Sequence, residues 1–282
     1  MTTSEANGRR HRYHAEATAL EGQLQLPLDQ EIKPQAYAKL PDNGGYLSQQ
    51  SADYRLEGVI SYRSAYTQVA GNRGQKPGHG FSTLSTSVVK GLNVLDVVTA
   101  DRVVAQVSIE HPLEGYVPHV SFLGTRFENL RIAGHPVKLD LDLDIIGRKP
   151  DNDLPYSKST AFMDRVAEQH GNVRAHPSLL SELIERYTGN TPNQENVEGV
   201  DCSLVNRAEG SFPGQCFGHV IEVPDFGTIV LAALRLEQSD YEASTPKETT
   251  VRLIMIELKM GCIGKGNVKV SSTVNNGGDV PG

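Results

Sequence analysis

Short alternations of apolar and polar residues dominate this chain and predict a mainly β protein. In most segments an apolar side chain falls at every second position, which is the spacing of a strand with one buried face. The predicted strands span approximately residues 17–26, 56–62, 81–89, 92–100, 102–110, 117–122, 131–135, 137–145, 217–223, 227–236 and 249–260. Many short strands separated by turns favour an antiparallel β-sandwich or roll.

Two of these strands carry more specific information. Segment 249–260 is apolar at both odd and even positions, which predicts a central strand covered on both faces. Segment 137–145 alternates strictly instead. Its apolar residues are Val137, Leu139, Leu141, Leu143 and Ile145, and its charged residues are Lys138, Asp140, Asp142 and Asp144. A strand here would bury one stripe and project three carboxylates from the other face, about 7 Å apart.

Helical periodicity is confined to one region. Apolar residues recur at helical spacing from about Ser157 to Gly171 and again from Ser178 to Tyr187, and Gly189 would end the second helix. We therefore predict an αα-hairpin over about 157–188, packed on the sheet. Residues 33–53 and 190–218 are rich in glycine, proline and polar residues and are predicted to be loops.

These elements define a predicted domain organisation. Residues 1–16 form a flexible N-terminal tail, and residues 17–270 form one β-sandwich-like domain with a helical insertion at 150–215. The polar residues 271–282 form a C-terminal tail. The 282 residues are sufficient for a large buried core.

Composition narrows the classes of function. The formal net charge of −7 argues against nucleic-acid binding, which needs a basic surface. No run of 18 apolar residues is present, so we expect no transmembrane helix. The first 20 residues contain no apolar core of a signal peptide, which predicts a cytoplasmic protein.

The runs LNVLDVVTADRVVAQVSIEH and VSFLGTRFENLRIAGHPV, within residues 92–137, carry a family resemblance. They resemble the β-repeat of bacterial surface proteins of the choice-of-anchor P type. The resemblance implies a β-sandwich-like fold and export from the cell, and it implies no activity. An extracellular location is therefore the alternative to a cytoplasmic one.

Two groups of residues could bind a metal ion. The row Asp140, Asp142 and Asp144 offers hard oxygen ligands suited to Ca²⁺, although one strand face cannot surround an ion and a half-exposed strand has the same pattern. The second group is His111, His119 and His135, which would suggest another divalent metal in a cupin-like site if they converge. Each of these histidines adjoins a proline, and strand ends are the alternative interpretation.

The cysteines and the absence of catalytic motifs complete the picture. Cys202 and Cys216 could form a disulfide in an oxidising compartment, and reduced thiols are the alternative. No nucleophile elbow or phosphate-binding loop is present. We therefore expect a non-enzymatic protein that acts by association, as an assembly subunit or binding module, and that forms homo-oligomers. A metal-dependent enzyme of cupin-like type is the alternative.

Overall fold

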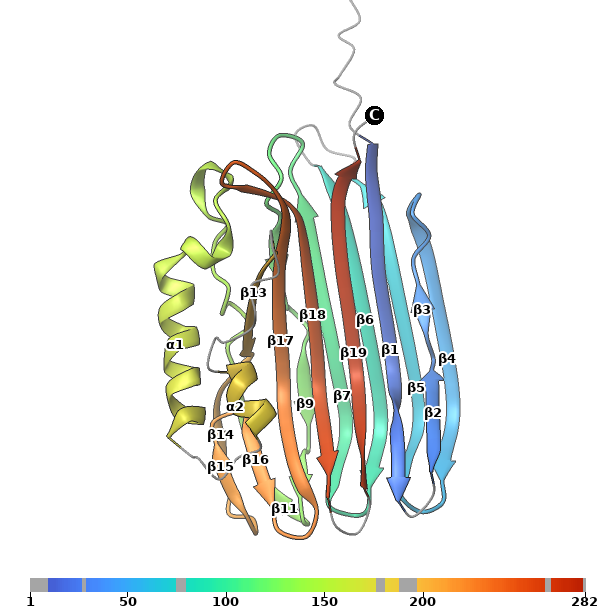
Figure 1. Ribbon diagram of the computed structural model, residues 1–282. Coiled ribbons are helices and arrows are strands. Elements are labelled where there is room, and N and C mark those ends of the chain that lie inside the picture. The colour runs from blue at the N-terminus through green and yellow to red at the C-terminus, as the bar shows by residue number, and fades with distance from the viewer. Residues whose placement is uncertain are drawn as a thin grey trace, which may run out of the picture.

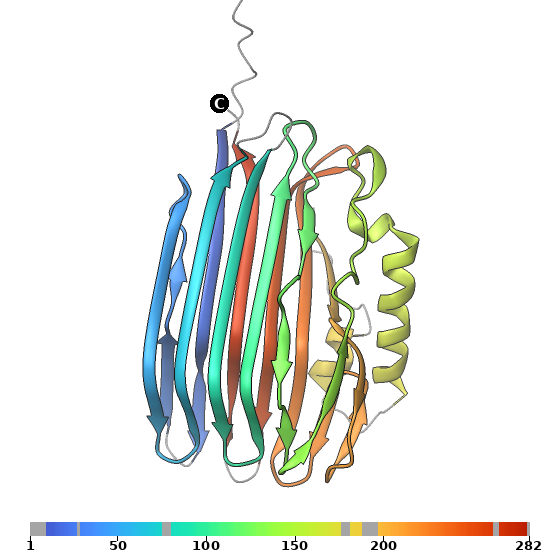
Figure 2. The same ribbon diagram turned by 180° about the vertical axis from the view of Figure 1, so that it is seen from behind.

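The computed structural model describes residues 10–26, 29–74, 80–175, 181–187, 197–261 and 265–280. Two antiparallel sheets face each other across a common core (Figures 1 and 2). The prediction of a mainly antiparallel β-sandwich is confirmed. Within this part of the chain, no helix is long and apolar enough to cross a membrane.

The strands of each sheet come from different parts of the sequence. Sheet A contains, in spatial order, β15 (Gln215–Phe217), β16 (Val220–Val223), β17 (Gly227–Glu242), β18 (Thr245–Met260), β19 (Lys265–Val280), β1 (Arg10–Leu26) and β2 (Gln30–Gln35). In addition, β13 (Val197–Ser203) pairs with β17, and β3 (Ala38–Lys39) pairs with β1. Sheet B contains β11 (His135–Pro136), β10 (Arg131–Ile132), β7 (Val98–His111), β6 (Phe81–Val94), β5 (Ile60–Arg73) and β4 (Gly45–Leu56), with β8 (His119–Ser121) and β9 (Arg126–Glu128) paired to β7. A separate ribbon joins β12 (Lys138–Leu141) to β14 (Val205–Glu209).

A row of backbone irregularities crosses sheet A and changes which residues face the core. Ala232 on β17, Met255 on β18 and Ser271 on β19 occupy matching positions, and Ala232 and Ser271 have φ values of 46° and 54°. Before this row, β18 buries its odd-numbered residues in the core. After it, from Ile256 onward, β18 buries its even-numbered residues there. The apolar residues at both parities of 249–260 arise mainly from this change. The prediction of a central strand is correct. In the part of the chain that the structure describes, apolar residues cover the outer face of β18 only at Ile254.

Ser271 also connects the two sheets. Its hydroxyl Oγ donates to the carbonyl of Ser87 (2.9 Å) and accepts the N–H of Ala105 (3.1 Å), both in sheet B. Nearby, Asn275 Nδ2 donates to the carbonyl of Val107 at 2.9 Å. Ser271 and Asn275 are fully buried, so these hydrogen bonds fix how the sheets stack.

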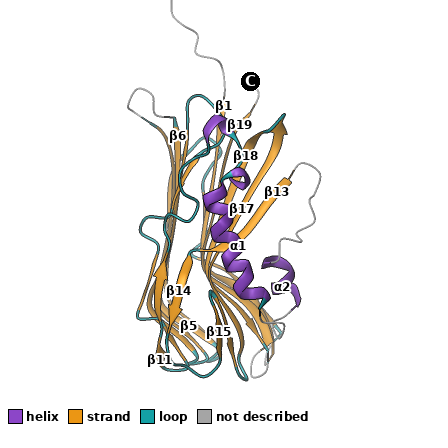
Figure 3. Ribbon diagram, turned by 90° about the vertical axis from the view of Figure 1, so that its left-hand side faces the viewer, coloured by secondary structure: helices purple, strands orange, loops and turns teal. Residues whose placement is uncertain are grey.

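The predicted αα-hairpin is confirmed. The structure has two short 3₁₀ turns (Asp151–Asp153 and Tyr156–Lys158) followed by α1 (Thr160–Arg174) and α2 (Ser181–Tyr187). Helix α1 lies along one side of the sandwich between the two sheets (Figure 3), and its Phe162 and Val166 enter the main core. Helix α2 packs Leu183 and Tyr187 on the outer face of sheet A, against Val230 and Ile254.

Several predicted boundaries were wrong. The predicted tails 1–16 and 271–282 overlap β1 and β19, which pair along 10–26 and 265–280 in the middle of sheet A. The predicted loop 33–53 contains most of β4, and the predicted loop 190–218, with much of the helical insertion 150–215, contains β13 and β14. Strand 137–145 ends at Leu141. Strand pairing is made by backbone hydrogen bonds, so a segment rich in polar side chains can also form a strand when a neighbouring strand supplies the partners. A hydropathy pattern does not reveal such strands.

The Ser271→Ala substitution should destabilise the fold by about 1–3 kcal/mol, because it leaves a buried N–H and a buried carbonyl without their partner. Equilibrium denaturation monitored by circular dichroism measures the change. Ser64→Ala serves as the control, since Ser64 is a half-exposed serine of β5, and it should change stability by less than about 0.5 kcal/mol. Equal effects for the two variants would contradict the bridging role of Ser271.

Candidate functional site

The outer face of sheet B carries a block of uncharged residues, which we call the uncharged face. Alternate residues of a strand share a face, and so do residues paired across strands. Three successive cross-strand rows run from β4 to β7 without a charge. They are Tyr46–Ala70–Leu84–Ser108, Ser48–Gln68–Thr86–Gln106 and Gln50–Tyr66–Val88–Val104.

The uncharged face is most open beside β4. Tyr46 is 64% exposed and Tyr66 is 36% exposed, whereas Val104 on β7 is buried. Charges resume at both ends of the block, with Glu110 in the next row on one side and Lys90 and Arg102 on the other. Since 22% of the chain is charged, twelve positions would carry between two and three charges on average. The block is therefore unusually neutral for a surface.

The strand that borders this face has an unpaired edge. Among the described residues β4 pairs only with β5, and its other edge faces away from the sandwich (Figures 1 and 2). Residues 46–52 contain no charge and no proline. The features that normally protect an edge appear only afterwards, where Asp53 has a positive φ of 29° and Arg55 follows.

The predicted histidine site does not form. His111 ends β7, whereas His135 pairs with Ile132 beside Val98, where β7 begins. The 13 residue-to-residue steps along β7 from Val98 to His111 correspond to about 40 Å. Among the described residues no group of three His, Cys, Asp or Glu side chains is arranged to hold a metal ion. The condition for a metal site at His111, His119 and His135 is therefore not met, and the alternative interpretation applies, since each of the three stands at the end of a strand.

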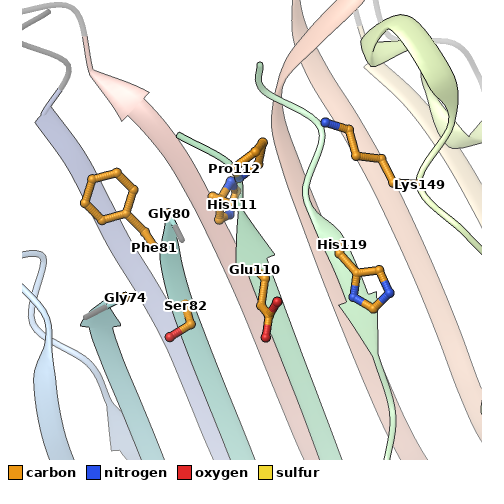
Figure 4. A pocket seen from close by; sticks show the side chains of 9 residues that line it. All are labelled: Gly74, Gly80, Phe81, Ser82, Glu110, His111, Pro112, His119 and Lys149. Carbon is orange, nitrogen blue, oxygen red and sulfur yellow. The ribbon is translucent and has the colours of Figure 1, made fainter. Parts of the chain in front are cut away.

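Two of these histidines do line one cavity of about 270 Å³ at the ends of β6 and β7 (Figure 4). His111 is buried, and its ring lies 4.8 Å from that of His11, which stacks on Phe81 at 4.3 Å. His119 is exposed on β8. Burial, together with the nearby His11 and Lys149, lowers the pKa of His111 to about 3. His111 is thus a neutral ring that packs the end of the sandwich.

The predicted aspartate row is also absent. Because the strand ends at Leu141, Asp142 and Asp144 lie in a turn. Asp140 accepts a hydrogen bond from Asn206 at 2.7 Å. Asp142 forms an ion pair with Arg165 of α1 at 2.9 Å and accepts the N–H of Asp144. These carboxylates fasten the ribbon and α1, and they do not converge on a common point.

Of the two interpretations of Cys202 and Cys216, the structure agrees with free thiols and not with a disulfide. Cys202 is buried on β13, Cys216 is exposed on β15, and both are free thiols. Burial, with the neighbouring Asp201 carboxylate, raises the pKa of Cys202, so it is a protonated and unreactive thiol. Cys262 lies outside the described residues.

The sequence did not predict a charged cluster that lies beneath α2. Asp201 of β13 has a side chain only 1% exposed, and it accepts hydrogen bonds from Arg186 of α2 (3.2 Å) and Arg235 of β17 (2.6 Å). Arg186 also pairs with Glu257 of β18 at 2.7 Å. A buried carboxylate with two guanidinium partners ties α2 to three strands. Its members lie up to 71 residues apart, so no local pattern could reveal it.

Comparison with known proteins matches the chain to a protein family. The family model described as a domain of unknown function (DUF8256) matches residues 11–237. This range includes all of sheet B and both helices, and it ends within β17, so β18 and β19 lie beyond it. No curated protein and no solved structure matches the chain.

His111 should make the fold sensitive to acid. Its pKa in the folded protein, about 3, lies below the ordinary value of 6.5, so the unfolded chain binds a proton that the folded protein excludes. Stability from this residue is complete above about pH 6.5 and falls by about 1.4 kcal/mol per pH unit toward pH 3. Between pH 6.5 and pH 3, the His111→Phe variant should lose less stability than the unmodified protein does, as measured by denaturation curves. The matched variant His119→Phe, at an exposed position, should lose as much stability as the unmodified protein. An unaltered pH dependence for His111→Phe would contradict this assignment.

Proposed function

We propose that this chain, which belongs to the DUF8256 family, is a non-enzymatic β-sandwich protein that acts by associating with further copies of itself through strand β4. The observation that carries the proposal is the edge of β4, a strand 12 residues long. This edge is unpaired among the described residues and uncharged over residues 46–52. An open edge of this kind offers a row of backbone donors and acceptors to another strand.

A second copy fits this edge without electrostatic conflict. An antiparallel pairing about a two-fold axis at Gln49 would place Tyr46 opposite Ala52, Leu47 opposite Ser51 and Ser48 opposite Gln50. Every pair is neutral. The protein as a whole carries a net charge of −7, so two copies repel each other across most of their surface. Contact through β4 and the uncharged face avoids that repulsion.

The chemistry of the rest of the described chain supports association over catalysis. The candidate metal ligands are dispersed or engaged in hydrogen bonds, and both described cysteines are free. The resemblance of residues 92–137 to choice-of-anchor P repeats stays a prediction, and with it the compartment in which association occurs.

The Gln49→Lys substitution should break the association. In the proposed pairing it places two ammonium groups directly opposite each other, about 5 Å apart between Cβ atoms, and a lysine on an edge strand deters pairing. Native mass spectrometry and light scattering should show oligomers for the unmodified protein and monomers for the variant. The expected loss of affinity is at least about 10-fold, since like charges directly opposite each other oppose the pairing.

The matched control is Gln215→Lys, which adds the same charge at an exposed position of β15 in sheet A. This variant should keep the oligomer, and both variants should keep the thermal unfolding temperature of the parent. A monomeric parent protein at about 100 μM, a concentration at which a dimer with a dissociation constant of about 10 μM would predominate, would refute the proposal. Retention of the oligomer by Gln49→Lys would exclude β4 as the contact.

A further inference from the structure

A groove lies between β9, at the edge of sheet B beyond β7, and the β12–β14 ribbon. Its volume is about 590 Å³, and its wall is largely apolar, formed by Phe127 of β9, Leu130, Val137, and Leu139 and Leu141 of β12. Figure 2 shows the ribbon beside the short light-green strands that continue sheet B past β7. The volume lies within the range of about 300–1,000 Å³ usual for small-molecule sites.

The groove explains an unexpected feature of β12. Its alternating pattern predicts a buried apolar stripe, yet Leu139 and Leu141 are only partly buried. Phe127 on the opposite wall is partly buried too. All three side chains pack against the main core, and only on the groove side do they lack the packing contacts of a protein interior. An apolar molecule in the groove would supply those contacts and release water from both walls.

The walls of the groove are held in place before any ligand binds. On the sheet side, Thr125 exchanges two hydrogen bonds with the backbone of Gln106, each 3.0 Å long, and Asn129 Nδ2 donates to Asp101 at 2.7 Å. On the ribbon side, Asp140 is bound to Asn206. A preformed groove requires little ordering on binding, which favours affinity.

The charged side chains at the rim favour an anionic group. Arg126 is paired with Glu128 at 2.8 Å, and Glu209 is paired with Arg207 at 3.3 Å. Lys138, which also lines the groove, is exposed and forms no ion pair with any described residue. Because Lys138 alternates with Leu139 and Leu141 along β12, its ammonium group belongs to the rim rather than to the apolar wall, where it is available to a carboxylate at the mouth of the groove.

We propose that this groove binds a small amphipathic carboxylate, such as a medium-chain fatty acid, with its apolar body against Phe127, Leu139 and Leu141 and its carboxylate at Lys138. The site is separate from β4, so its occupation does not depend on the association proposed above.

The sequence itself provides a sensitive probe, because the chain contains no tryptophan. A Phe127→Trp variant places a single indole in the groove wall. Titration with dodecanoate below its micelle concentration should shift the emission to the blue and saturate. Calorimetry on the unmodified protein should give the same stoichiometry of one and a dissociation constant in the micromolar range, that is, about 1–100 μM. Absence of saturable binding in both measurements up to about 1 mM would overturn the proposal.

Two variants of the protein distinguish the contribution of the ligand's apolar chain from that of its carboxylate. Lys138→Gln should weaken dodecanoate about 10-fold, the effect of losing one charge-assisted hydrogen bond, and should leave the neutral dodecanol unchanged. Leu139→Trp fills the groove and should abolish binding of both while the circular dichroism spectrum is retained. Equal binding of dodecanoate and dodecylamine would overturn the assignment of the head group.

The control for non-specific adsorption is Leu123→Glu, which removes a leucine that is 71% exposed and does not line the groove. Binding of dodecanoate should be unchanged in this variant. A loss equal to that of Leu139→Trp would show adsorption to exposed apolar surface and would refute the groove as the site.

Discussion

The whole architecture depends on keeping one face of very long strands against the opposite sheet. Strands β17, β18 and β19 each have 16 residues, about three times the usual length. The row through Ala232, Met255 and Ser271 changes the buried parity of sheet A partway along, so that apolar residues face the core on both sides of it. At the same row, Ser271 forms its hydrogen bonds to sheet B. One irregularity therefore both orients the side chains and connects the sheets.

The outer faces of the two sheets then differ in chemistry. Sheet A is partly covered by α2, which is held by Leu183, Tyr187 and the buried Asp201 with its arginines. Among the described residues no helix packs on the outer face of sheet B, which carries the uncharged face beside β4. The apolar groove lies at the other edge of that sheet, between β9 and the β12–β14 ribbon. The two proposals therefore concern opposite edges of sheet B.

The candidate metal sites depended on how distant residues are arranged in space, which the sequence does not give. Asp140, Asp142 and Asp144 were interpreted as a row because a strand was expected to continue through Ile145, and the chain turns after Leu141 instead. His111, His119 and His135 lie within 25 residues of one another, yet a 14-residue strand separates the first from the last in space. The Asp201 cluster joins residues from a helix and three strands, which only the pairing of β13 with β17 brings together.

The sequence by itself determined the fold class, the αα-hairpin and the central position of β18, because period-2 and period-3.6 patterns reflect local geometry within a single segment. It also determined that residues 46–52 and the apolar stripe of β12 are neutral or apolar. Only the tertiary structure decided that the first is an open edge and the second the wall of a groove. Exposure of a strand depends on which neighbours pair with it and cover it, and those neighbours come from distant parts of the chain.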